Sequence, residues 1–423
     1  MSWFSSQSSN SSKDATNFYP VTSYLSGYGE LTSADTAWAN TSNKGFQTET
    51  QIWYTVLEDG TWIMVQIIWS YVGIFLVPAT TQMTFKVYNP HTQKSTWRSI
   101  NASGAKFDKQ NLKTDQFEIK HTGSPTTEEV YHIVADLDKS VHLDVKFTKP
   151  AEAPGFKFGQ GAQGGITTFG KDREEAKRDG FVVHRFHPFS FSSGTATIED
   201  KPLDVKGDGM FVHAIQGMRP NLVATRWNFA FFTTTPGADD PKLGGVRAVQ
   251  MEFETTDEYG PKGSKSGRTK VNIGAVYTTK HSPLIVTGQT HLPPSSTDVY
   301  PHPTDSISSA VHKSPIKDKE TGYLVPSSIE FEWSAQKVSG EGKVSAKVVR
   351  DVAGAVVGQG GLIEKVDVLA EIPYVIRKGL AAVTGTKPYI YQYHNPATLN
   401  VEIDGESIPV KGYLFNEASF VSE

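Results

Sequence analysis

The sequence predicts an all-β protein with short helices, built from antiparallel sheets that form barrels or sandwiches. The first observation is the alternation of apolar and polar residues over short runs, as in residues 141–147. The second is the pair Asp59-Gly60, typical of a tight turn, between strand-like runs at 51–57 and 62–68. The third is that Gly, Pro and Asn separate these runs, a spacing that favours barrels or sandwiches over βαβ units.

The first 45 residues differ from the rest of the chain. They are rich in Ser, Thr and Asn and show no stable hydrophobic period. They also lack the cationic and apolar regions of a secretory signal. We therefore expect residues 1–45 to form a mostly disordered, Ser-rich arm.

Residues 62–79 form a run of 18 residues without a charge, which is long enough for a transmembrane helix. Gly73 and Pro78 interrupt it, its content of β-branched and aromatic residues is high, and it continues into an alternating segment at 80–88. The sequence therefore predicts two buried strands joined by a turn near Gly73.

One layout occurs twice along the chain. Residues 210–224 are predicted as a short helix, broken by a proline, that leads into an aromatic strand. Residues 372–383 have an apolar stripe at helical spacing and lead into a second aromatic strand. We therefore predict two β-domains of one type that meet near residues 218–235. Their expected bounds are 46–225 and 226–423, with a proline-rich loop insertion at 293–327 in the second.

Composition excludes several kinds of chemistry. The 423 residues include no cysteine, so disulfides, thiolate zinc sites, iron–sulfur clusters and cysteine nucleophiles are absent. The formal net charge of −4 gives no global basic field, which argues against a nucleic-acid partner. The G-x-G-x-x-G string at 159–164 lacks a following helix and is predicted to be a loop.

Three histidines are candidate metal ligands. His184 and His187 are three residues apart, so in a strand they point to opposite faces, and nothing fixes the position of His213. We interpret all three as structural and expect no metal and no cofactor.

The aromatic strands are the strongest signal for a site, in a chain with 23 Phe, 16 Tyr and 8 Trp. Period-2 spacing places one aromatic row on a strand of each domain. Two interpretations stay open: ordinary core packing, or the wall of a wide apolar pocket for a lipid-like ligand. The candidate ligand-binding residues are Trp62, Trp69, Arg226, Trp227, Phe229, Phe231, Tyr389, Tyr391 and Tyr393.

Several longer strings, taken together, resemble the fungal (yeast) survival-factor family. The resemblance covers roughly residues 45–415. The strings are GMFVHAIQGMRPNL at 209–222, TRWNF at 225–229, HRF at 184–186, QMEF at 250–253, RTKVNIG at 268–274 and KPYIYQY at 387–393.

The resemblance implies two tandem lipocalin-like antiparallel β-barrels. It also implies non-vesicular transfer of ceramide-like sphingolipids from endoplasmic reticulum to Golgi, and survival under oxidative and cold stress. The expected location is the cytoplasm, with peripheral attachment to endoplasmic reticulum and Golgi membranes; a nuclear pool is left open.

The resemblance also implies peripheral attachment to membranes through an N-terminal amphipathic helix. Residues 5–12 of this chain lack an apolar stripe, which leaves Trp3 and Phe4, with Phe18 and Tyr19 after them, to insert. Ile376 and Leu380, in the apolar stripe of residues 372–383, are the other candidate membrane contacts.

Three functions are compared. The first, which we favour, is a lipid carrier that is not an enzyme and has no obligate protein partner. The second is an isomerase, hydratase or pericyclase acting on a long polyene or polyketide, as in distant relatives with the same double barrel. It needs an acid or base facing the cavity, such as His132, His213 or Asp144. The third is a stress-response interaction module with filled barrels.

Overall fold

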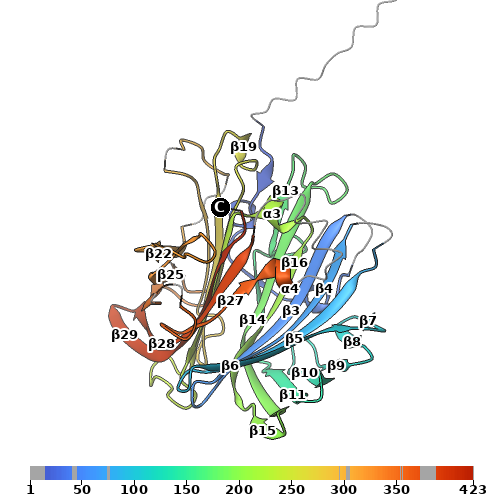
Figure 1. Ribbon diagram of the computed structural model, residues 1–423. Coiled ribbons are helices and arrows are strands. Elements are labelled where there is room, and N and C mark those ends of the chain that lie inside the picture. Colours follow the sequence, from blue (N-terminus) through green and yellow to red (C-terminus); the bar gives the residue numbers. More distant parts are fainter. Residues whose placement is uncertain are drawn as a thin grey trace, which may run out of the picture.

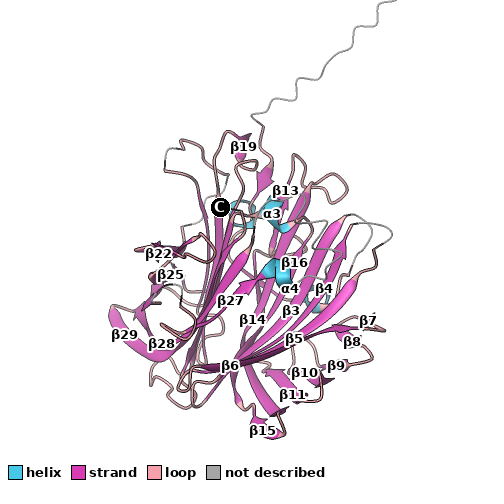
Figure 2. Cartoon of the chain, in the orientation of Figure 1, coloured by secondary structure: helices cyan, strands magenta, loops and turns pink. Residues whose placement is uncertain are grey.

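The computed structural model describes residues 15–40, 45–73, 77–294, 296–301, 305–352, 354, 356–371 and 387–422. Strands dominate, and the helices are single turns, which confirms the predicted all-β fold with short helices (Figure 2). Within those described ranges, no helix has the length and apolar character needed to cross a membrane. The helices are α1 (Val21–Tyr24), α2 (Ser33–Thr36), α3 (Pro220–Val223) and α4 (Val368–Glu371).

The first sheet is a curved half-barrel in the order β6-β5-β4-β3-β16-β14-β11-β10-β9-β8-β7, with all pairs antiparallel (Figure 1). Short strands from the chain start, together with β12, β13 and β15, attach to its side. Its strands are β1 (Phe18–Tyr19), β2 (Tyr28–Glu30), β3 (Phe46–Leu57), β4 (Trp62–Val72), β5 (Thr80–Asn89), β6 (Lys94–Ala102), β7 (Lys106–Asp108), β8 (Asn111–Lys113), β9 (Phe117–Thr122), β10 (Glu129–Asp136), β11 (Val141–Lys149), β12 (Phe156–Phe158), β13 (Ile166–Phe169), β14 (Gly180–Ile198), β15 (Lys201–Asp204) and β16 (Gly207–Gln216).

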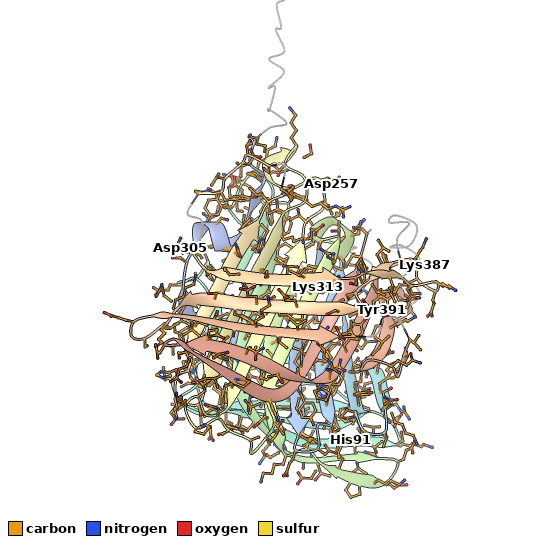
Figure 3. The ribbon with its side chains drawn as sticks, turned by 90° about the vertical axis from the view of Figure 1, so that its left-hand side faces the viewer. His91, Asp257, Asp305, Lys313, Lys387 and Tyr391 are labelled. Carbon is orange, nitrogen blue, oxygen red and sulfur yellow. The ribbon has the colours of Figure 1, made fainter. Side chains whose placement is uncertain are left out.

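The second sheet runs β21-β20-β18-β17-β29-β28-β26-β25-β22 and forms a nearly closed barrel. Its two end strands meet through side chains, since the Thr287 and Ser308 hydroxyl oxygens lie 3.0 Å apart. Figure 3 shows the orange strands, including the one that carries Lys313, crossing the yellow and green strands behind them. Its strands are β17 (Arg226–Thr234), β18 (Val246–Glu254), β20 (Lys270–Thr278), β21 (Ile285–His291), β22 (Ile307–Lys313), β25 (Ser328–Gln336), β26 (Lys343–Asp351), β27 (Leu362–Asp367), β28 (Tyr389–Ile403) and β29 (Glu406–Phe420). The chain also forms β19 (Pro261–Ser264) and the small hairpin of β23 (Ile316–Lys317) and β24 (Leu324–Val325).

The charge-free run at 62–79 forms one strand, β4, which ends at Val72 before Gly73, and the second predicted strand, β5, begins only at Thr80. β4 pairs with β3 through a tight turn in which Gly60 has a φ of 81°, and it pairs with β5 beyond Gly73. Side chains alternate between the two faces of β4, so Ile63 and its odd-numbered neighbours enter the half-barrel while Trp62 and Met64 point out of it.

Four apolar clusters result among the described residues. One fills the concave face of the first sheet, a second fills the closed barrel, and a third lies between the two sheets, where the outer faces of β3, β4, β17 and β29 meet. The fourth, which includes Phe18, Phe169 and Phe253, joins the start of the described chain to both sheets. Trp62 stacks on Phe415 in the third cluster, with ring centroids 4.4 Å apart. The two sheets are thus joined by a packed apolar interface.

The expectation of a disordered arm over residues 1–45 is wrong for its described second half. Phe18 is fully buried, and Asp35 accepts a hydrogen bond of 2.7 Å from Lys157. Ala39 and Asn40 donate backbone hydrogen bonds to the buried Glu49 carboxylate. The arm is ordered because charges buried in the first sheet need partners, and the arm supplies them.

Two further expectations are corrected. Residues 210–216 belong to β16 and not to a helix; the strand packs against an apolar cluster on each face, so its sequence is apolar without alternation. Residues 293–327 are not one long loop, because β22 completes the barrel and β23 and β24 follow it. The string at 159–164 forms the predicted turn between β12 and β13.

Candidate functional site

A groove opens between the two sheets where their outer faces diverge. We call it the intersheet groove. Its floor comes from β3, β4 and β5 of the first sheet, and its other wall comes from β27, β28 and β29 of the second. Figure 1 shows β27 and α4 between the strands of the second sheet and strands β3 and β4 of the first. The cavity has a volume of about 170 Å³. Ligand pockets usually have about 300–1,000 Å³, so this groove accommodates part of a long lipid and leaves the remainder outside it.

Most of the groove wall is apolar. Its side chains come from the outward rows of the strands, whose inward rows fill the half-barrel. Trp97 lies at the rim and is 39% exposed. An alkyl chain placed here exchanges water for hydrocarbon contacts, at about 25 cal/mol per Å² of apolar surface removed from water. The apolar lining comprises Ile52, Tyr54, Met64, Ile68, Trp97, Val366, Val368 and Ile390.

Four polar side chains form a connected row in the groove, and we call them the polar row: Lys86, Glu364, Gln392 and Glu417. The buried Lys86 ammonium forms an ion pair with Glu364 and donates a hydrogen bond of 2.8 Å to Gln392 Oε1. Gln392 Nε2 donates to Glu417 Oε1 at 2.7 Å. The row thereby links β5 of one sheet to β27, β28 and β29 of the other.

The Glu417 carboxyl is the unusual group of the row. It lies deep among protein atoms, and this burial raises its pKa above the usual value, although Gln392 and Lys86 oppose the shift. Glu417 therefore retains its proton to a higher pH than an exposed glutamate does. The polar row thus places carboxyl, amide and ammonium groups side by side within an apolar groove.

The predicted aromatic residues do not share one wall. Phe229 and Phe231 point out of the second barrel, into the intersheet cluster with Trp62. Trp69 lies inside the half-barrel, and Trp227 packs on Phe253 with ring centroids 5.0 Å apart. The expected alignment of these rings along barrel walls is therefore corrected, because the two faces of each strand serve different cores.

Tyr389, Tyr391 and Tyr393, the aromatic row predicted for the second domain, belong to the core of the second barrel. Tyr391 donates a hydrogen bond of 2.6 Å to Asp318, and Tyr393 donates one of 3.2 Å to the Gly354 carbonyl. Tyr389 packs against the same core at its edge. Arg226 forms an ion pair of 3.1 Å with Glu254. These contacts are the ordinary packing that the sequence left open as one of two interpretations.

His184 and His187 are buried, and His187 Nε2 lies 3.8 Å from Glu129 Oε2 without a hydrogen bond. His213 is bonded to Glu49 at 2.8 Å and to the Asp35 carbonyl at 2.7 Å. His132 and Asp144 form a pair on the outer, solvent-facing side of β10 and β11, so the suggestion that they face a cavity is wrong. Among the described residues, no cluster of His, Asp or Glu has metal-binding geometry.

Trp3, Phe4, Ile376 and Leu380 lie outside the described residues, as does the predicted helix at 372–383. Sequence reasoning missed the polar row, which joins strands up to 331 positions apart (Lys86 to Glu417). The available signal was a polar residue within an aromatic or apolar strand, such as the lone amide Gln392 in YIYQY or the lone carboxylate Glu417 in LFNEASF.

The fold and the groove define a class of protein. It is an all-β protein of two packed sheets, and the groove between the sheets has a mainly apolar wall that contains the polar row. Within that class, the chain belongs to the Svf1 family, whose sequence profile matches residues 1–422. This confirms the resemblance to the survival-factor family.

The chain is similar to curated fungal proteins along nearly its whole length. The ceramide-binding protein SVF1 of Yarrowia lipolytica is 32% identical, over 93% of this chain and 91% of the relative. The ceramide-binding protein SVF1 of Debaryomyces hansenii is also 32% identical, over 94% and 90%. Among solved structures, a putative AttH from Nitrosomonas europaea matches with a TM-score of 0.49 at 12% identity, over 90% of this chain and 96% of that one.

Proposed function

We propose that this protein is a lipid carrier that binds one ceramide-like lipid in the intersheet groove. The polar row carries the proposal, because it offers donors and acceptors within an apolar wall. Ceramide has a neutral headgroup with one amide and two or more hydroxyl groups, which matches such a row. The names of the curated relatives support the same ligand class.

The carrier role extends the binding role. A neutral lipid with long chains crosses water slowly by itself, so a groove that covers its headgroup and chain roots lowers that barrier. The proposal therefore includes transfer between endoplasmic reticulum and Golgi without vesicles, from a cytoplasmic pool that contacts both membranes peripherally. It further includes support of resistance to oxidative stress through sphingolipid balance. No catalytic step is part of this function.

Substitution of Gln392 tests the proposal. Gln392→Leu keeps the side-chain volume but breaks the row between Lys86 and Glu417. We expect ceramide binding, measured with a fluorescent ceramide, to weaken about tenfold, since a hydrogen bond to a charged or ligand group contributes about 1.5 kcal/mol. Gln250→Leu is the matched control, a buried glutamine on β18 that donates to the Glu332 carbonyl. Equal ceramide affinity in folded Gln392→Leu and Gln250→Leu would contradict the proposal.

One observation favours a second candidate function. A carboxyl with a raised pKa in an apolar groove can act as a general acid, as a hydratase or isomerase requires. Glu417→Gln separates the two functions. A carrier retains most ligand binding in this variant and shows no turnover in either form. An enzyme that uses Glu417 converts a bound polyene or polyketide only in the wild type, as seen by mass spectrometry of the extracted ligand.

A further inference from the structure

A second groove lies in the wall of the second barrel, far along β28 from the intersheet groove. β26 and β28 pair over residues 345–347 and 400–402 and then separate. β28 continues along β29 while β26 continues along β25. The gap opens into a groove of about 550 Å³, which we call the β26–β28 groove. Its polar lining residues are Thr235, Arg350, Thr398, Asn400, Lys411 and Tyr413.

Arg350 occupies an unusual position in this groove. It alternates with the exposed Val349 and Asp351, so it belongs to the inward row of β26, as do the buried Val348 and Val352. Its Nε is buried without a hydrogen-bond partner. In the part of the chain that the structure describes, its guanidinium also has no ion-pair partner. A buried N–H without an acceptor is costly, so the Arg350 Nε would gain from an anionic partner in the groove.

Lys411 supplies a second positive charge. It is exposed on β29, directly across from Thr398 of β28. No ion pair involves Lys411 within the described ranges, whereas Lys347, nearby on β26, is held by Glu330 at 2.7 Å. The described lining of the groove contains no carboxylate. The β26–β28 groove is therefore a pocket of unpaired positive charge in a protein of net negative charge.

The remaining polar groups point to the ligand. The hydroxyls of Thr235 and Thr398 and the amide of Asn400 line the same groove as the two cations. Arginine, lysine and hydroxyl donors that converge on one space are the usual partners of a phosphate group. The polar row of the intersheet groove differs from the β26–β28 groove in its charge, because it holds two glutamates for one lysine and so suits a neutral headgroup. We propose that the β26–β28 groove is a phosphate-binding site, occupied by the phosphate of an anionic lipid headgroup or by free phosphate.

Binding measurements on the full chain test this site. One arm measures sedimentation with phosphatidylcholine vesicles, with and without phosphatidic acid, and the other measures inorganic phosphate by calorimetry. Lys411→Gln removes an exposed charge, so its fold should persist, and Arg350→Gln removes the inner one. Lys201→Gln is the matched control, an exposed lysine on β15 of the first sheet.

We expect each groove variant to weaken binding about fivefold, since a cation near an anionic surface contributes about 1 kcal/mol, and Lys201→Gln to match the wild type. Binding to phosphatidic acid vesicles that is absent with phosphatidylcholine identifies a lipid headgroup. Binding of inorganic phosphate with no vesicle preference identifies free phosphate. If Lys411→Gln, confirmed as folded, binds both probes as the wild type does, or if Lys201→Gln loses as much as Lys411→Gln, the site does not exist.

Discussion

The interior of the second barrel and the space between the sheets share strands β28 and β29 but are filled differently. Inside the barrel, Trp333 and Phe331 are fully buried, and the Trp333 indole donates to the Val249 carbonyl at 2.8 Å. Gly274 faces this ring, and a Cβ there would lie 2.6 Å from the indole nitrogen. Between the sheets, the packed rings end at the intersheet groove, where the polar row begins. The difference shows that aromatic content alone does not identify a ligand cavity.

The first prediction breaks the barrel interior. Trp333→Ala removes the largest ring from a close-packed core and leaves a cavity, so we expect the free energy of unfolding to fall by about 3–5 kcal/mol. Urea denaturation measures this loss. Trp97→Ala at the groove rim is the control, with a change in unfolding free energy within about 0.5 kcal/mol because its ring is already partly in water. A similar loss in both variants would remove the distinction between interior and groove.

The second prediction concerns how the half-barrel is closed by the arm. Asp35 is buried and pairs with Lys157 and with Arg185, whose Nε lies 3.1 Å from Asp35 Oδ1. Asp35→Asn leaves two buried cations without their anion, and we expect it to cost about 3–5 kcal/mol at neutral pH, measured by chemical denaturation.

The free energy that Asp35→Asn costs is expected to decrease as the pH falls. Hydrogen bonds from Lys157 and Thr32, with the Arg185 charge, hold the pKa of Asp35 below its usual range against the effect of burial. The stabilisation is therefore complete above the unfolded-state pKa of about 3.9 and disappears as the pH falls through the lower, folded-state pKa. A difference between wild type and Asp35→Asn that grows on acidification would contradict this assignment.

The third prediction concerns His184, for which we expect a smaller effect on the free energy of unfolding. As with Asp35, the stabilisation is lost when the pH falls. Burial lowers the pKa of His184 to about 4, against about 6.5 in the unfolded chain. Above pH 6.5 the imidazole ring is neutral and the protein keeps its full stability. As the pH falls from 6.5 toward 4, the free energy of unfolding decreases, by about 2 kcal/mol between pH 7 and pH 5. His184→Leu should remove this part of the acid sensitivity. Replacing the exposed His91, labelled in Figure 3, should leave it unchanged.

Local patterns predicted much of the fold. The alternation of β11, the Asp59-Gly60 turn and the interrupted run from Trp62 each depend on residues close in sequence. The order of the arm could not be predicted, because Asp35 pairs with Lys157 and Arg185, which lie more than 100 positions away along the chain. β16 was assigned to a helix because a strand buried on both faces has no alternation to distinguish it.

The site was predictable only in its chemistry. The aromatic rows indicated apolar surface, but not which face of each strand lines the groove. Phe229 lies in the cluster between the sheets and Tyr391 in the core of the second barrel. This division depends on how the two sheets pack. The polar row joins strands from both halves of the chain, so no local spacing indicates it.

Mapping a photoactivatable ceramide on the full chain tests the central claim most directly. After illumination, mass spectrometry of the digested protein locates the attached lipid. We predict adducts on Met64, Ile68, Val366 and Ile390, which line the intersheet groove, and fewer adducts in Gln392→Leu. Adducts concentrated on Phe331, Trp333 and Tyr393, inside the second barrel, would contradict the account.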